Sequence, residues 1–280
     1  MAFVAIERNY LIMKFLLDLL NSDMMKPEAY QSFSKSWFHY LSLVITLLVI
    51  IMLTRKFKVA DDKKLKRMLL VFGIVMIILE IYKQIIFTYQ ANAYQWYAFP
   101  FQFCSTPMYL FIIYGLNKNH KVDQYLLSFL ATYSTFAGIA VMLYPADVFI
   151  ETIGINIQTM VHHGLMAAVG FSLLITKFKL SIKYFLKGSA VFAILMTLAM
   201  IMNIIFNMQD IDATFNMFFI NERFGSHLPI LMDIEPLVPH LAFLAIYLFG
   251  FSFVASIIFM IGYLFRTIIY KEKYKLIDLF

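Results

Sequence analysis

The chain has 280 residues, of which 62% are hydrophobic and only 14% are charged. A soluble domain carries about 25% charged residues, so the composition excludes an ordinary soluble protein. The net charge is +6, but the lysines and arginines lie mostly in short loops between apolar runs, which is typical of membrane orientation signals rather than of a nucleic-acid partner.

The apolar pattern predicts an all-α fold. In residues 3–20 apolar side chains recur at helical spacing, which predicts an amphipathic helix at the membrane surface. Seven apolar runs of membrane-spanning length follow, and we expect a polytopic bundle of seven transmembrane helices. The expected spans are 37–54, 68–88, 100–117, 124–144, 156–176, 188–206 and 240–265. The predicted division is an amphipathic segment 1–36, a transmembrane domain 37–266 and a basic cytoplasmic tail 267–280.

The loops predict the orientation. Basic residues are concentrated in 55–67, 118–121 and 177–187 and after the last span, whereas the alternate loops 89–99, 145–155 and 207–239 contain only Arg223. The positive-inside rule then predicts an outer N-terminus, a cytoplasmic C-terminus and a multi-pass plasma-membrane protein. The long loop 207–239 is too apolar for a free linker, so we expect it to fold back over the outer end of the bundle.

Polar side chains in four of the spans fall in one layer of the outer-leaflet half, where ionisable groups are costly and mark candidate sites. They are Glu80, Lys83, Gln102, Cys104, Ser105, His162, His163 and Asn203. Glu80 and Lys83 share a helix face, either as an internal ion pair that orders the bundle or as direct contacts to a substrate.

Cys104 is the only cysteine, so no intrachain disulfide can form. A helix that begins at Pro100 would place this thiol in its second turn, where the helix dipole favours a thiolate, and Pro107 would bend that helix. The alternative is a small apolar packing residue. His162 and His163 point about 100° apart, so only one can face the thiol, as a base or as a structural hydrogen-bond partner. No metal-binding or phosphate-binding motif is present, and we expect no metal or cofactor.

Three stretches carry a family resemblance: AFPFQFCSTPMYLF (98–111), GIAVMLYP (138–145) with INIQTMVHHGLM (155–166), and the aromatic-rich loop 212–231. They resemble the YwaF-like bacterial membrane proteins, which are grouped with the eukaryotic transmembrane protein 164 acyltransferases. The resemblance implies an acyltransferase in which Cys104 is the nucleophile and His163, or else His162, is the base.

The implied reaction moves an acyl chain from a phospholipid through a cysteine thioester to a lysophospholipid or to water. Gln102, Ser105 and Asn203 are then candidates to stabilise the oxyanion, Lys83 to bind the lipid phosphate and Glu80 to orient the histidine. The sequence also allows two other hypotheses. The protein is a transporter or small-molecule binding protein that uses the Glu80–Lys83 pair, or it is a sensor or structural partner of another membrane protein. The oligomeric state is not predicted.

Overall fold

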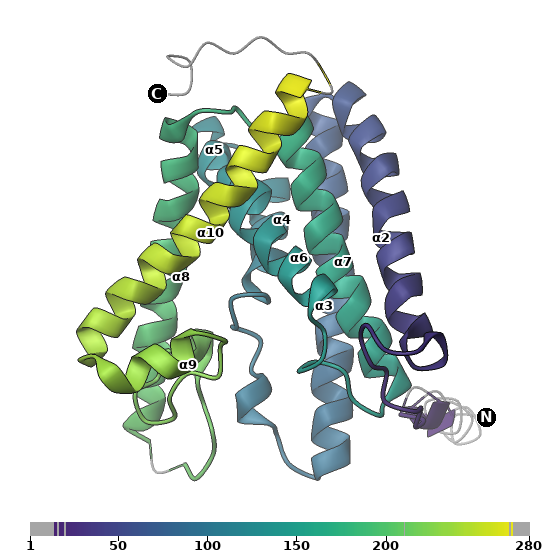
Figure 1. Cartoon of the computed structure of the whole chain (residues 1–280), viewed down its shortest axis with the longest axis vertical. Coiled ribbons are helices and arrows are strands. Elements are labelled where there is room, and N and C mark those ends of the chain that lie inside the picture. The colour runs from purple at the N-terminus through teal and green to yellow at the C-terminus, as the bar shows by residue number, and fades with distance from the viewer. Residues whose placement is uncertain (1–13, 16, 20, 210, 269, 271–280) are drawn as a thin grey trace, which may run out of the picture.

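The computed structural model describes residues 14–15, 17–19, 21–209, 211–268 and 270. In this part of the chain the fold is helical, and six helices are long and apolar enough to cross a membrane (Figure 1). They are α2 (Phe33–Val59), α3 (Asp62–Ala91), the continuous helix of α5 (His120–Phe129), η2 (Leu130–Ser134) and α6 (Thr135–Leu143), α7 (Ile153–Thr176), α8 (Ile182–Asn207) and α10 (His240–Ile268). The all-helical prediction is confirmed, and six of the seven predicted spans coincide with these helices.

The third predicted span, 100–117, is not one continuous helix. Only its second half is helical, as α4 (Thr106–Leu116), and residues 99–105 form an irregular stretch that ends in a turn. Pro107 lies in the first turn of α4, where its missing N–H costs no hydrogen bond, so it begins the helix instead of bending it. Eleven residues rise about 16 Å, roughly half of a hydrocarbon core of about 30 Å.

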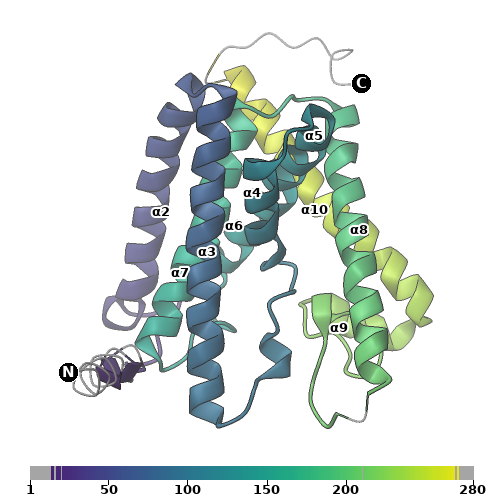
Figure 2. The ribbon, with the colours of Figure 1, turned by 180° about the vertical axis from the view of Figure 1, so that it is seen from behind.

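α4 lies against α3 on the side of the molecule shown in Figure 2. A side chain on Gly73 of α3 would place its Cβ 2.7 Å from the Cγ1 atom of Ile112, and one on Gly115 of α4 would lie 2.6 Å from the Cβ atom of Leu70. These two glycines therefore allow the short helix to sit directly on its neighbour.

The centre of the bundle is α7, which is the most buried of the six long helices. A Cβ on Gly164 would lie 2.7 Å from the Oγ1 atom of Thr46 in α2, and one on Gly138 of α6 would lie 2.7 Å from the backbone oxygen of His163. Both α2 and α6 thus pack closely against α7 beside its histidine pair.

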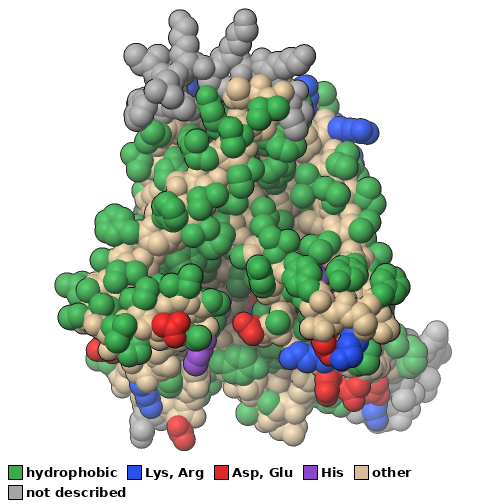
Figure 3. All heavy atoms as spheres, in the orientation of Figure 1, with side chains coloured by type: hydrophobic (Ala, Val, Ile, Leu, Met, Phe, Trp, Pro, Cys, Tyr) green, Lys and Arg blue, Asp and Glu red, His purple; other side chains and the backbone are tan. Residues whose placement is uncertain are grey.

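The outside of the bundle is apolar, as a membrane protein requires. Hydrophobic side chains cover most of the face in Figure 3. Leu48 of α2 and Ile194 of α8 are each 60% exposed, although both lie in the middle of long helices. Such side chains have lipid rather than water as their natural surroundings.

The two ends of the bundle differ. At one end the basic segments meet, because the Lys66 Nζ atom lies 2.7 Å from Asp123 Oδ2 and Lys177 Nζ donates to the Ala60 carbonyl at 2.6 Å. At the other end Met24 N–H donates to the Glu151 carbonyl at 2.6 Å, just before α7. The predicted amphipathic helix over 3–20 and the predicted tail 267–280 lie largely outside the described residues.

Candidate active site

Cys104 lies in the turn that leads into α4. This corrects the prediction that it lies in the second turn of a helix starting at Pro100, because the helix starts six residues later. The N–H groups of Ser105 and Thr106 donate to the Gln102 carbonyl at 2.8 and 3.2 Å, which closes the turn. The half-buried thiol therefore still stands at the N-terminal end of a helix, where the dipole favours negative charge.

The loop between α8 and α10 folds back into the bundle and contacts this turn. Gln102 Nε2 donates to the Asn216 carbonyl at 2.8 Å, and the Phe218 N–H donates to Gln102 Oε1 at 2.9 Å. Phe218 is fully buried. The predicted return of this loop over the bundle is thus confirmed, and Gln102 is the residue that joins it to the Cys104 turn.

Asn203 of α8 holds the same loop from the opposite side. Its Nδ2 atom donates to the Met217 carbonyl at 3.0 Å, and its Oδ1 atom accepts from the Met217 N–H at 2.8 Å. The next two residues, Phe218 and Phe219, have φ angles of 60° and 56°, a left-handed conformation that non-glycine residues adopt at a cost. The two amide side chains hold this strained turn in place.

The two histidines of α7 are both buried, and each has one nitrogen engaged. His162 Nε2 lies 3.0 Å from the Cys104 carbonyl oxygen, and His163 Nδ1 lies 2.8 Å from the Thr159 carbonyl oxygen. A carbonyl only accepts, so in each neutral ring the engaged nitrogen carries the proton and the other has a free lone pair. Neither His162 Nδ1 nor His163 Nε2 has a partner among the described residues.

Tyr247 of α10 adds a further polar atom at the same place. Its ring stacks on Phe251 at a centroid distance of 4.4 Å, and Phe251 contacts Phe103, the residue before Cys104, at 5.1 Å. The hydroxyl is buried without a partner in the described part of the chain. A buried unpaired hydroxyl is uncommon, and a bound ligand would explain it.

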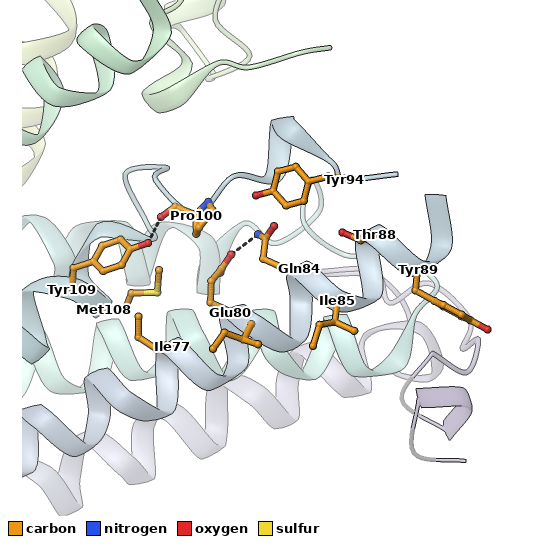
Figure 4. Close-up of a pocket in the computed structure, with 11 residues that line it drawn as sticks. Ile77, Glu80, Gln84, Ile85, Thr88, Tyr89, Tyr94, Pro100, Met108 and Tyr109 are labelled. Carbon is orange, nitrogen blue, oxygen red and sulfur yellow. Dashed lines mark hydrogen bonds between the residues drawn. The ribbon is translucent and has the colours of Figure 1, made fainter. Parts of the chain in front are cut away.

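Glu80 and Lys83 form the ion pair that their spacing predicts, with 2.9 Å between Nζ and Oε1. Gln84 Nε2 donates to the same Oε1 atom and to the Ala98 carbonyl, both at 2.7 Å. The charges of Glu80 and Lys83 reach Cys104 and His163. The carboxylate lines a groove of about 590 Å³ between α3 and residues 94–109 (Figure 4).

A comparison with known families matches residues 32–263 to the TMEM164 family. The chain belongs to the TMEM164 family. The match contains the Cys104 turn, the histidine pair, the Glu80–Lys83 pair and the returning loop. It bears out the transmembrane protein 164 part of the resemblance, and the YwaF-like grouping stays a prediction. Neither the curated proteins nor the solved structures gave a match.

In this member of the TMEM164 family the predicted site residues fall into two groups. The turn that carries Cys104 and Ser105 is brought against His162, with His163 one residue further along α7. Gln102 and Asn203 instead direct both polar atoms of their amides to the backbone of the returning loop. Within the described residues, no group of three or more histidine, cysteine or acidic side chains is placed to hold a metal ion.

Tyr247 was not singled out from the sequence of this TMEM164 family member. It stands in an apolar run, LAFLAIYLFGF (241–251), in which a tyrosine is indistinguishable from the packing aromatics around it. Only its unpaired hydroxyl distinguishes it, and that requires the structure.

Proposed function

We propose that this protein is a membrane acyltransferase that moves an acyl chain from a phospholipid, through a thioester on Cys104, to a lysophospholipid or to water. One observation carries the proposal. The sole cysteine of the chain stands at a helix N-terminus, its turn is held by His162, and the neighbouring His163 keeps a buried, unpaired nitrogen. The resemblance to the transmembrane protein 164 acyltransferases supports it.

In the first half-reaction, His163 Nε2 takes the thiol proton and the Cys104 sulfur attacks the carbonyl carbon of a phospholipid ester. The tetrahedral intermediate collapses, the ester C–O bond breaks, and the proton on His163 passes to the leaving oxygen. A lysophospholipid departs and the acyl group remains on sulfur. His162 acts by positioning, because its Nε2–H holds the Cys104 carbonyl.

In the second half-reaction, a lysophospholipid hydroxyl or a water molecule gives its proton to His163 and attacks the thioester carbon. The C–S bond breaks, and the sulfur takes the proton back. Two groups are suited to stabilise the oxyanion in both halves: the N–H of Cys104, which lies against its own sulfur, and the unpaired Tyr247 hydroxyl.

The proposed setting is the plasma membrane, with the N-terminus outside and the C-terminus in the cytoplasm. The stretch 99–105 together with α4 makes the seventh crossing. The meeting of the basic segments at one end supports this orientation through the positive-inside rule. The site then lies in the outer-leaflet half of the bundle.

The test detects the covalent acyl adduct on the protein. The purified protein in lipid bicelles is given a phospholipid with an isotopically labelled acyl chain, and its intact mass is measured before and after hydroxylamine treatment. We expect a labile acyl adduct on the wild type, none on Cys104→Ala and little on His163→Ala, with circular dichroism confirming that both variants are folded.

A wild-type protein without an adduct, in membranes whose lipids stay unchanged over long incubation, would overturn the proposal. The transporter hypothesis would then be favoured. It predicts that Cys104→Ala is tolerated and that loss of the Glu80–Lys83 pair is not.

A further inference from the structure

The face of α3 that lines the groove carries two stripes of side chains, one polar and one apolar. Glu80, Gln84 and Thr88 are spaced by four residues and form a polar stripe along one face of the helix, while Ile81 and Ile85 form an apolar stripe beside it. The isoleucines are 54% and 48% exposed on the outside of the bundle. The groove is therefore open to the side, where lipid lies, and its accessible surface is almost entirely apolar, with Glu80 as the one charged residue among those that line it.

The length of the groove matches one leaflet. Its lining on α3 runs from Ile77 to Tyr89, a rise of twelve helical steps or about 18 Å. Half of a hydrocarbon core is about 15 Å. The opposite wall is residues 94–109, the same segment that carries Cys104, and Figure 4 shows Pro100 and Tyr109 of that wall across from Glu80. A lipid in this groove therefore lies against the chain segment that carries Cys104.

Glu80 supplies an acceptor inside the groove. Its side chain is 5% exposed, and both Lys83 Nζ and Gln84 Nε2 bind to its Oε1 atom. Among the described residues, no hydrogen bond reaches Oε2. A carboxylate oxygen in such a groove gains from a hydrogen-bond donor that a bound molecule brings.

We propose that this groove binds the acyl acceptor, a lysophospholipid whose free glycerol hydroxyl donates a hydrogen bond to Glu80 Oε2 while its chain lies along Ile81 and Ile85. This inference rests on the proposed function and places the acceptor within it. A diacyl phosphatidylcholine has no hydrogen-bond donor, so the carboxylate selects the lipid that has lost a chain. An ammonium headgroup has the same donor chemistry, and the experiment separates the two.

The experiment measures equilibrium binding to the Cys104→Ala protein in bicelles, where no thioester can form. The probes are a lysophosphatidylcholine, its 2-O-methyl ether, which lacks only the donor, and a diacyl phosphatidylethanolamine, which has an ammonium but no hydroxyl. We expect both other lipids to bind about tenfold more weakly than the lysolipid, the value of one hydrogen bond to a charged group.

Two pairs of variants locate the effect. The double change Glu80→Met with Lys83→Met removes both charges together, and we expect it to abolish the preference for the hydroxyl. Lys66→Met with Asp123→Leu removes the ion pair at the other end of the bundle and should keep the preference. Ile81→Trp fills the groove and should weaken lysolipid binding at least tenfold, whereas Ile194→Trp, which also faces lipid, should not.

Equal affinities for the lysolipid and its methyl ether would overturn the inference. Glu80-dependent binding of the phosphatidylethanolamine that equals lysolipid binding would also overturn it, since the ammonium would then be the ligand. Binding is measured without Cys104, so it does not depend on the thioester test. If the Cys104→Ala protein prefers the hydroxyl but the wild type forms no thioester, the groove is supported and the acyl transfer is refuted. If the wild type forms the thioester but the Cys104→Ala protein shows no preference for the hydroxyl, the acyl transfer is supported and the groove is refuted as the acceptor site.

Discussion

At Gly138 the backbones of α6 and α7 lie close together, and replacing this glycine with alanine tests the packing around the histidines. The new Cβ would lie 2.7 Å from the His163 backbone oxygen and 2.9 Å from the Met166 Cβ atom, and closer still to the Ala167 nitrogen. These neighbours are mostly backbone, so α6 and α7 must separate. Overpacking of this kind costs about 1–3 kcal/mol.

Gly250 of α10 provides the matched control, because a Cβ there would meet nothing within 4 Å. Both glycines lie inside helices, so Gly→Ala brings each variant the same gain of about 1 kcal/mol in helix propensity. The difference in unfolding free energy between Gly138→Ala and Gly250→Ala is then the packing cost alone, and we expect about 1–3 kcal/mol.

The assay is unfolding in mixed micelles by titration with a denaturing detergent, followed by circular dichroism. We expect Gly250→Ala to equal or exceed the wild type and Gly138→Ala to unfold first. The Gly138 variant should also form the thioester more slowly, because the His163 backbone moves with α7 and catalysis is sensitive to small displacements. If Gly138→Ala were as stable as Gly250→Ala, the described contact between α6 and α7 would be refuted.

Three further predictions concern other parts of the structure. Asn203→Leu leaves the buried N–H of Met217 without a described partner and its carbonyl with only the Ile220 N–H, at 3.4 Å, so it should cost about 1–3 kcal/mol and speed proteolysis within 208–239; unchanged proteolysis would contradict the anchoring role. Tyr247→Phe removes a hydroxyl with no described protein partner, so thermal stability should stay constant while thioester formation slows about 100-fold, and an unaffected rate would exclude an oxyanion role. Lys66→Met removes the close partner of Asp123 Oδ2 and leaves the carboxylate with the Asn117 amide, which donates to Oδ1, so it should cost about 1–3 kcal/mol in the same detergent titration. Adding Asp123→Leu should restore most of that loss, and a double variant that recovers nothing would refute the pairing.

Hydropathy predicted the helices well wherever apolar length and helical structure coincide. It failed at 100–117, where the run is apolar but only Thr106–Leu116 is helical. Pro107 begins the helix, and a long-range contact holds the stretch before it. Gln102 binds the backbone of Asn216 and Phe218, more than a hundred residues away in the chain. Composition carries no information about such a contact.

The candidate site shows the same limit. The sequence left open whether a histidine faces the Cys104 thiol, and the resemblance favoured His163. The structure instead brings His162 Nε2 to the Cys104 carbonyl oxygen. Gln102 and Asn203 stood out as polar groups in apolar spans, and their observed bonds are to the returning loop. The sequence singled out these residues, whereas the direction of each side chain depended on helix rotation and on the loop.

The shortness of α4 has a consequence for how the protein is made. Eleven apolar residues are too few to leave the translocation channel for lipid as an independent span, and residues 99–105 carry backbone polar groups that lipid cannot satisfy. Their partners come later in the chain: His162 for the Cys104 carbonyl and the 216–218 loop for Gln102. The segment with the thiol can therefore settle only after α7, α8 and the loop have been synthesised. A nascent chain halted before α8 would present this segment to the quality-control machinery of the membrane as an unassembled span.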